Sequence, residues 1–508
     1  MKTDTTSALQ SPEAAPEDRV PARTKIAYGL GGSIDMWGHW LYPNLAYPVF
    51  NIALGLSPQL VGLALMLIRI VDALSDPLFG WLSDNARTRF GRRRPFILVG
   101  GLCAGLGLPL LFFVTPGWGT THHNFLLHWN WDLGFFRWAV DLRNLEISKY
   151  FWWMLGSSFL YIPFVSCFNM PYQSLGNELT PDYHERTSVM SFKGVIQKVF
   201  EIAFFIGLPF TNLAFFTVAA TGKQDVLLGV QVFCGILGVL MLISGLMVFF
   251  NVKERYYAGV AARQKDKVSL RESIYETLKC RPFRLKLLAG LCFSLGSSMV
   301  GSLGYYATVY YVAGGDTKSG NNWNGLMGAA WMVGGFLGVP ALAWVCRRVG
   351  KRPAFLLTCG LGFVAYAGSW FLYTPAVPWL QVVASGSFAF VAASYYMLDQ
   401  TIGADIMDFD ELKTGKRREG AFSACGSWMN KAGNAIGYFF SGQVLGLTGF
   451  SADKVAQSPE TIFWIRALLA GIPVAGVCLA ALFMWRFPLT QAKMADIRAQ
   501  LEARRGKV

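Results

Sequence analysis

The sequence predicts an all-α polytopic membrane protein with 12 transmembrane helices, arranged as two six-helix halves of similar plan. Three observations support this prediction. Of the 508 residues, 53% are apolar and only 15% are charged, whereas soluble domains carry about 25% charged residues. Apolar stretches of about 20 residues, the length of a helix that crosses a bilayer, recur along the whole chain. Sequence motifs also repeat between the two halves of the chain.

Twelve segments are long and apolar enough to be spanning helices. Glycine is frequent within them, as at Gly105 and Gly107, and small residues allow helices in lipid to pack closely. The predicted spans are residues 26–50, 58–83, 95–115, 150–177, 188–216, 228–251, 284–312, 323–346, 354–373, 377–403, 420–447 and 461–486.

The polar segments divide these spans into two bundles. Residues 1–24 are polar and rich in Pro and Ala, without the apolar core of a signal peptide, so we expect a disordered cytoplasmic tail. The charged segment 253–283 is the predicted cytoplasmic linker between an N-terminal bundle (25–252) and a C-terminal bundle (284–487). Residues 488–508 form a second predicted cytoplasmic tail.

The net charge of +14 could indicate a nucleic-acid partner, but the distribution of the charges argues against one. Most of the 45 Lys and Arg residues lie in one alternate set of predicted loops, and few lie in the other set. Membrane proteins show this asymmetry because their cytoplasmic loops are rich in Lys and Arg. We therefore expect a multi-pass protein of the inner (plasma) membrane with both termini in the cytoplasm.

The longest predicted external segment, 116–149, is rich in Trp and His. Trp favours the membrane interface, so we expect an interfacial helix at the level of the lipid headgroups. A metal site formed by His122, His123 and His128 is the alternative, although no paired carboxylate or Cys accompanies them. The nine Cys residues are scattered singly, which indicates neither a disulfide framework nor a zinc site.

An internal repeat supports the division into six plus six spans. The segments Gly80–Pro95 and Gly338–Pro353 follow the second and eighth spans, and both end in a basic turn before Pro. The segments Ser174–Ser188 and Thr401–Ser423 follow the fourth and tenth spans, and both run from acidic to basic. Two such halves, with the substrate held between them near the bilayer midplane, are the plan of major-facilitator carriers.

Three longer stretches resemble one family within this plan. Asp72–Pro95, Asn169–Ser188 and Ala404–Gly437 are similar to the glycoside–pentoside–hexuronide:cation symporters, which include the melibiose carrier. The similarity covers nearly the whole chain. It implies cation-coupled symport of a sugar or glycoside by a major-facilitator fold that works as a monomer. It also implies no cofactor other than the coupling ion, Na⁺ or H⁺.

The second span carries four polar residues on or beside one helical face. Arg69, Asp72 and Asp76 are spaced i, i+3, i+7, and Ser75 lies between the two acids. A charged residue inside lipid costs roughly 2.5–3.5 kcal/mol on insertion scales, so those that persist usually line a cavity. Carboxylate and hydroxyl oxygens are ligands for a small alkali cation. The alternative is that Arg69 only neutralises the acids and fixes helix packing.

The resemblance assigns a cation site to Asp72, Ser75, Asp76 and Ser166, with Asp72 and Asp76 as the acidic ligands of Na⁺. The family has an amide where this chain has Ser75 and a Thr where it has Ser166, which leaves the choice between Na⁺ and H⁺ open. Lys431 is isolated in the eleventh span, and Asp72 and Asp76 are its expected partners. We hypothesise that Lys431 competes with the cation for these carboxylates.

The sugar site is predicted from polar and aromatic residues inside the spans. The resemblance implies that Asp35 accepts hydrogen bonds from sugar hydroxyls, and Asn169 stands where the melibiose carrier has a second acid. Lys198 and Glu201 either contact the solute or form a structural ion pair, and each aromatic residue either stacks on a sugar or simply packs. The candidate substrate contacts are Asp35, Trp37, Arg69, Asn169, Tyr172, Gln173, Lys193, Lys198, Tyr396 and Trp428.

Charged residues also cluster at the cytoplasmic ends of the spans in both halves. Opposite charges there could bridge the halves and hold an inner gate shut, whereas solvated loop charges are the alternative. Exposed pairs contribute only about 0–1 kcal/mol each, so a gate needs a network. The candidate gate residues are Asp84, Arg87, Glu178, Arg186, Asp405, Asp408, Glu411 and Arg417.

Other functions receive less support from the sequence. A lipid or amphiphile carrier of the same fold and a non-transporting solute sensor remain alternatives. No Walker-type phosphate loop is present, which argues against nucleotide-driven transport. Only five His residues occur and no nucleophile–base arrangement can be assigned, so we do not expect an enzyme.

Overall fold

The computed structural model shows a helical protein. It describes residues 19–123, 128–132, 137–141, 145–177, 179–180, 183–218, 224–254, 275, 277–415, 419–452, 454 and 456–505. Most of the predicted N-terminal tail and of the predicted linker therefore lies outside the described residues.

The N-terminal half contains helices at each of the first six predicted spans. The first span is divided, because α1 ends before Gly31 and the chain continues as α2 and then as a π-helical turn, η1. The helices of this half are α1 (Ala22–Leu30), α2 (Gly32–Ala46), η1 (Tyr47–Ala53), α3 (Pro58–Asn85), α4 (Arg94–Leu110), α5 (Lys149–Asn177), α6 (Tyr183–Phe210), η2 (Ala214–Phe216) and α7 (Val226–Asn251).

The C-terminal half contains helices at the other six predicted spans and one further helix. These helices are α10 (Arg281–Tyr306), η3 (Ala307–Val312), α11 (Thr317–Val349), α12 (Lys351–Leu372), α13 (Leu380–Thr414), α14 (Glu419–Leu447), α15 (Pro459–Trp485) and α16 (Gln491–Arg505). The buried residues Met494, Ile497 and Leu501 lie on one face of α16, which packs against α13. In the described part of the chain, eight helices are long and apolar enough to cross a membrane.

Small residues allow the helices of each half to approach closely. A Cβ atom at Gly100 of α4 would lie 2.4 Å from the backbone nitrogen of Phe168 in α5. A Cβ atom at Gly334 of α11 would lie 2.0 Å from the carbonyl oxygen of Gly386 in α13. Only glycine permits these backbone contacts, as is typical of helix packing in lipid.

The segment between α4 and α5 forms strands, so the predicted interfacial helix is wrong. Strand β1 (Thr120–His123) pairs antiparallel with β4 (Leu145–Ser148), and β2 (His128–Asp132) pairs with β3 (Arg137–Asp141). Trp131 lies opposite Trp138 in this register. Polar and aromatic residues alternate with a period of two in β2 (HWNWD), which favours a strand over a helix. The side chains of the predicted histidine site lie outside the described residues.

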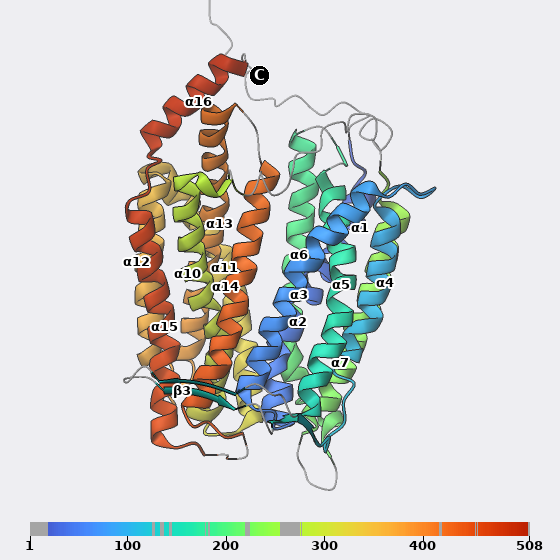
Figure 1. Ribbon diagram of the computed structural model, residues 1–508, viewed down its shortest axis with the longest axis vertical. Coiled ribbons are helices and arrows are strands. Elements are labelled where there is room, and N and C mark those ends of the chain that lie inside the picture. Colours follow the sequence, from blue (N-terminus) through green and yellow to red (C-terminus); the bar gives the residue numbers. More distant parts are fainter. Residues whose placement is uncertain are drawn as a thin grey trace, which may run out of the picture.

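The two halves lie side by side, with α3 packed against α14 and α6 packed against α11. We call the end that carries β1–β4 the hairpin end and the opposite end the α16 end (Figure 1). At the hairpin end, Tyr306 donates a 2.5 Å hydrogen bond to Asn51, and Asn212 donates a 2.9 Å hydrogen bond to Asn322. Toward the α16 end, the helices of the two halves lie farther apart (Figure 1).

Candidate functional site

Helix α3 holds the predicted charged residues inside the protein. Asp72 is fully buried, and Arg69 and Asp76 are only 4% and 9% exposed. The Nη1 atom of Arg69 lies 3.1 Å from Asp72 Oδ2, and its Nη2 atom donates a 2.8 Å hydrogen bond to the carbonyl oxygen of His39. The acids therefore face partners inside the protein and not lipid.

Lys431 of α14 completes a cluster that spans the two halves. Its Nζ atom lies 2.9 Å from Asp72 Oδ1 and 2.5 Å from Asp76 Oδ2. Two carboxylates thus meet one ammonium and one guanidinium group, and the four formal charges balance. Breaking such a buried arrangement by removing one partner is strongly unfavourable. We call Arg69, Asp72, Asp76 and Lys431 the ion-pair cluster.

Two hydroxyl groups lie beside this cluster. The Oγ atoms of Ser75 in α3 and Ser166 in α5 are 2.7 Å apart, and Ser75 also donates to the carbonyl oxygen of Asp72. Among the described residues, Asp76 Oδ1 is buried without a hydrogen-bond partner. The structure thus brings together the four residues of the predicted cation site, and their hydroxyl and carboxylate oxygens suit a small cation or a proton.

His39 is a member of this site that our sequence analysis missed. Its Nε2 atom lies 3.4 Å from Asp72 Oδ1, and its Nδ1 atom lies 2.9 Å from the carbonyl oxygen of Asp35. A carbonyl oxygen only accepts, so Nδ1 donates and Nε2 is the nitrogen that faces the carboxylate. His39, Asp72 and Asp76 offer ligand atoms within 4.8 Å of one another. His39 lies inside the first predicted span, 26–50. An ionisable residue inside a span is costly and often functional, so His39 could have been selected on the same grounds as the acids.

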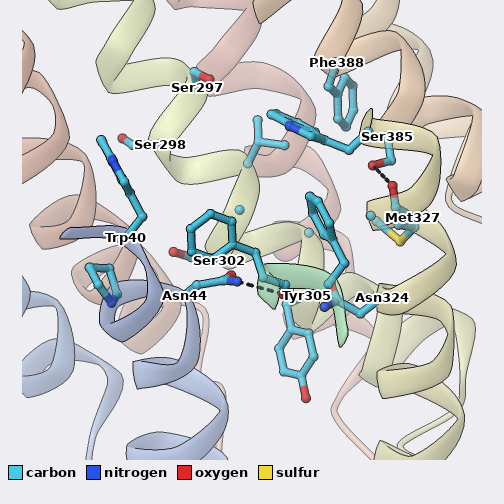
Figure 2. A pocket seen from close by; sticks show the side chains of 18 of the residues that line it. Trp40, Asn44, Ser297, Ser298, Ser302, Tyr305, Asn324, Met327, Ser385 and Phe388 are labelled. Atoms are coloured by element: carbon cyan, nitrogen blue, oxygen red, sulfur yellow. Dashed lines mark hydrogen bonds between the residues drawn. The ribbon is translucent and has the colours of Figure 1, made fainter. Parts of the chain in front are cut away.

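A large cavity lies between the halves (Figure 2). Its volume is about 450 Å³, and we call it the aromatic cavity. Helix α2 contributes Trp40 and Asn44, and the C-terminal half contributes Tyr305, Phe388 and Trp331 among others. Pockets of about 300–1,000 Å³ are typical of small-molecule sites.

A smaller polar cavity adjoins the aromatic cavity. Its volume is about 350 Å³, and Asp35, Gln197 and Lys198 line it. Trp40 and Glu201 line both cavities. The Trp40 ring also lies 4.6 Å from the guanidinium carbon of Arg69. One side chain therefore contacts both cavities and the ion-pair cluster.

The predicted substrate residues have different positions around these cavities. Asp35 and Lys198 line the polar cavity, and Tyr396 lines the aromatic cavity. Lys193 lies 3.7 Å from the Asp35 carboxylate, and Lys198 forms a 2.6 Å ion pair with Glu201.

The other predicted substrate residues are not among those that line either cavity. Trp37 and Tyr172 are buried within the N-terminal half, where they donate to the carbonyl oxygens of Phe200 and Tyr28, respectively. Gln173 donates to Asn169. The remaining two are Arg69, which lies behind the Trp40 ring, and Trp428, which is 44% exposed on α14.

The predicted gate residues lie on the α16 side of the molecule, and the structure describes only part of them. Asp405 lies 2.7 Å from Lys351, which belongs to the same half. The helices of the two halves lie farther apart at this end (Figure 1), so the gate stays a prediction. Arg87 is exposed, whereas Asp408 and Glu411 are half-buried on α13. Glu178, Arg417 and the side chains of Asp84 and Arg186 lie outside the described residues.

Comparison with known proteins identifies the family. The family described as MFS/sugar transport protein matches residues 45–491. The chain belongs to this family. A glucuronide carrier protein homolog of Escherichia coli K12 is 24% identical over 95% of this chain and 96% of its own. The inner membrane symporter YicJ of the same organism is 27% identical over 94% of each chain.

The fold agrees with this family assignment. A crystal structure of a D-xylose-proton symporter aligns with a TM-score of 0.60 over 92% of this chain and 98% of that chain, at 14% sequence identity. This similarity supports the fold alone. The predicted major-facilitator fold and the resemblance to glycoside–pentoside–hexuronide:cation symporters are confirmed, and the protein is a multi-pass membrane transporter.

Proposed function

We propose that this MFS/sugar transport protein couples uptake of a sugar or glycoside to the entry of Na⁺ or H⁺ along its gradient. The observation that carries the proposal is the ion-pair cluster, in which Lys431 of one half contacts both Asp72 and Asp76 of the other. A coupled carrier needs a cation site whose occupancy changes the contacts between its halves.

Lys431 supplies that link. When its ammonium group holds both carboxylates, the site is neutral and the halves are tied together at mid-helix. An arriving cation would take the oxygens of Asp72, Asp76, Ser75 and Ser166, and Lys431 would be released. Cation binding thereby changes the free-energy difference between the arrangement of the halves in which Lys431 holds both carboxylates and the one in which Lys431 is released.

The neighbouring cavities would bind the sugar. Asp35, Gln197 and Glu201 present acceptors and donors to the polar cavity, which suits a hydroxylated ring. Trp40 couples this region to the cation site, because its ring covers Arg69. Transport on this mechanism needs movement of the halves and no covalent chemistry.

With both termini in the cytoplasm, the α16 end, where the helices of the two halves lie farther apart, faces the cytoplasm (Figure 1). The positive charge of the loops supports this orientation in the inner membrane. The contacts at the hairpin end then close the external side. One chain contains both halves and the whole site, which supports a working monomer.

Purified protein in proteoliposomes tests the proposal. Uptake of radiolabelled methyl and phenyl glycosides of glucose, galactose and xylose is measured under an imposed Na⁺ or H⁺ gradient. We expect one gradient to drive accumulation, and Asp72→Asn and Asp76→Asn to lower it at least tenfold. The exposed Asp496 of α16 provides the control, Asp496→Asn, which should accumulate solute normally.

Three results would overturn the proposal. Wild-type accumulation by both site variants would exclude Asp72 and Asp76 as the coupling groups. Transport of lysophospholipid in place of every glycoside would indicate an amphiphile carrier, and glycoside binding without transport would indicate a sensor.

A further inference from the structure

We infer that the substrate is an uncharged glycoside with an apolar aglycone, whose sugar occupies the polar cavity and whose aglycone occupies the aromatic cavity. This inference rests on the proposed function and specifies its substrate class. It follows from the unequal chemistry of two adjoining cavities and from the pairing of the charges in them.

The aromatic cavity has walls that suit a flat apolar group. The C-terminal half contributes the rings of Tyr305, Trp331, Tyr366, Tyr373 and Phe388. Aromatic walls of this kind bind rings by stacked or edge-to-face contacts. Glu201 is the one charged residue among those that line this cavity, and it lies on the side shared with the polar cavity.

Several polar groups of the aromatic cavity are already bonded within the protein. Ser385 donates a 2.8 Å hydrogen bond to the carbonyl oxygen of Met327 (Figure 2), and Ser298 donates to the carbonyl oxygen of Leu295. Tyr305 donates to Asn321. These three hydroxyl groups have already used their donor hydrogens, so a sugar hydroxyl placed against them finds only acceptors there, and each unsatisfied group costs about 1–3 kcal/mol. An apolar group incurs no such cost.

The polar cavity has the opposite character. Asp35, Gln197, Lys198 and Glu201 face it from the N-terminal half. Trp40 lines both cavities and is 42% exposed, so its ring is available to the apolar face of a sugar at the boundary. The order of the cavities therefore orients a two-part ligand, with its hydroxyl groups against α2 and α6.

The charges around the polar cavity cancel one another. Lys198 pairs with Glu201 at 2.6 Å, and Asp35 has Lys193 at 3.7 Å and the Gln197 amide at 3.1 Å. Two ammonium groups face two carboxylates, so no excess positive charge remains for an anionic ligand. Burying a further carboxylate here would be unfavourable. The wall thus selects against uronides, although one relative is named as a glucuronide carrier homolog.

Equilibrium binding to the purified full-length protein tests both parts of the inference. The ligands are methyl and phenyl glycosides of glucose, galactose and xylose, together with phenyl glucuronide. For the sugar that binds best, we expect the phenyl glycoside to bind at least tenfold more tightly than the methyl glycoside. We expect phenyl glucuronide to bind at least tenfold more weakly than phenyl glucoside.

Variants test which cavity residues cause the preference for the phenyl group and the discrimination against the glucuronide. Trp331→Leu and Phe388→Leu should reduce the phenyl-to-methyl affinity ratio to about threefold or less. Trp323→Leu is the matched control on α11, because Trp323 packs edge-on against Trp379 and does not line the cavity, so it should keep the full ratio. Glu201→Gln removes the partner of Lys198. The affinity for phenyl glucuronide should then come to within threefold of the affinity for phenyl glucoside.

The outcomes separate this inference from the proposed function. If methyl and phenyl glycosides bind equally while a cation gradient drives their uptake, the aglycone site is refuted and the symporter stands. If wild-type protein binds phenyl glucuronide as tightly as phenyl glucoside, the requirement for an uncharged ligand is refuted. If no glycoside binds or is transported, both proposals fail.

Discussion

Lys431 Nζ lies 2.5 Å from Asp76 Oδ2, although the two residues belong to different halves and are 355 positions apart in the sequence. The same ammonium group also reaches Asp72. The contact joins the acids of α3 to α14 of the C-terminal half, so any ligand of these carboxylates must compete with the Lys431 ammonium group.

Removal of Lys431 should make stability depend on the coupling cation. Lys431→Ala leaves two buried carboxylates with Arg69 as their nearest full positive charge. Breaking a buried ion pair costs about 3–5 kcal/mol, so we expect a clearly lower Tm in cation-poor buffer at neutral pH. Addition of NaCl should restore Tm if Na⁺ is the coupling ion, whereas acidification should restore it if H⁺ is.

Tryptophan-fluorescence melting with choline chloride as the ionic-strength control measures this effect. The exposed Lys454 gives the matched variant, Lys454→Ala, whose Tm should not respond to either ion. A Lys431→Ala protein as stable as wild type under all conditions would contradict a role for Lys431 in neutralising the acids.

The Ser166 hydroxyl should contribute to cation affinity. Ser166→Ala removes one oxygen of the Ser75–Ser166 pair, while Ser75 keeps its bond to the Asp72 carbonyl oxygen. A hydrogen-bonding group of this kind is worth about 0.5–1.5 kcal/mol. We therefore expect the cation concentration that gives half-maximal uptake to rise about three- to tenfold.

The measurement is initial uptake of the transported glycoside against cation concentration. Ser166→Thr keeps a hydroxyl group at the same position. Its cation concentration for half-maximal uptake should stay within twofold of the wild-type value. Equal affinities in the Ala and Thr variants would show that the hydroxyl does not take part.

The hydrogen bond between Tyr306 and Asn51 should stabilise the present conformation. Both residues are buried, and their bond joins the halves at the hairpin end. Tyr306→Phe removes it at a cost of about 1 kcal/mol, which favours opening at that end about fivefold.

A membrane-impermeant maleimide can report this opening from the hairpin side. Its reaction with Ser302→Cys, placed in the aromatic cavity, should accelerate about fivefold when Tyr306→Phe is added, after subtraction of labelling in the parent protein. Tyr275→Phe, at an exposed site, should cause no change. An unaltered rate in the Tyr306→Phe protein would argue against this contact as a closing element.

Gly334 should be required for the packing of α11 on α13. A Cβ there would lie 2.0 Å from a carbonyl oxygen of α13, so Gly334→Ala must push the helices apart. Overpacking typically costs about 1–3 kcal/mol. Gly360→Ala is the control, because a Cβ at Gly360 meets nothing within 4 Å. We expect a lower Tm for the first variant and an equal or higher Tm for the second, whereas equal Tm values would contradict the close contact.

The ion-pair cluster could be largely predicted from the sequence, because charged residues are rare and costly inside apolar spans. The same reasoning, applied to acids, lysines and arginines but not to histidines, overlooked His39. The walls of the aromatic cavity could not be found in this way. With 15% aromatic residues, the sequence contains many rings that only pack, and nothing local distinguishes Trp331 or Phe388 from them.

The sequence by itself determined the twelve helical segments, their grouping into two halves and the acids of α3, because hydrophobic length and buried charge are properties of a single segment. The structure agrees with the expected contact of Lys431 with Asp72 and Asp76. The tertiary structure alone decided that His39 joins them and that two cavities of unequal chemistry adjoin at Trp40. The physical reason is that these contacts depend on how helices from distant parts of the chain pack, and a segment's own composition does not encode its neighbours.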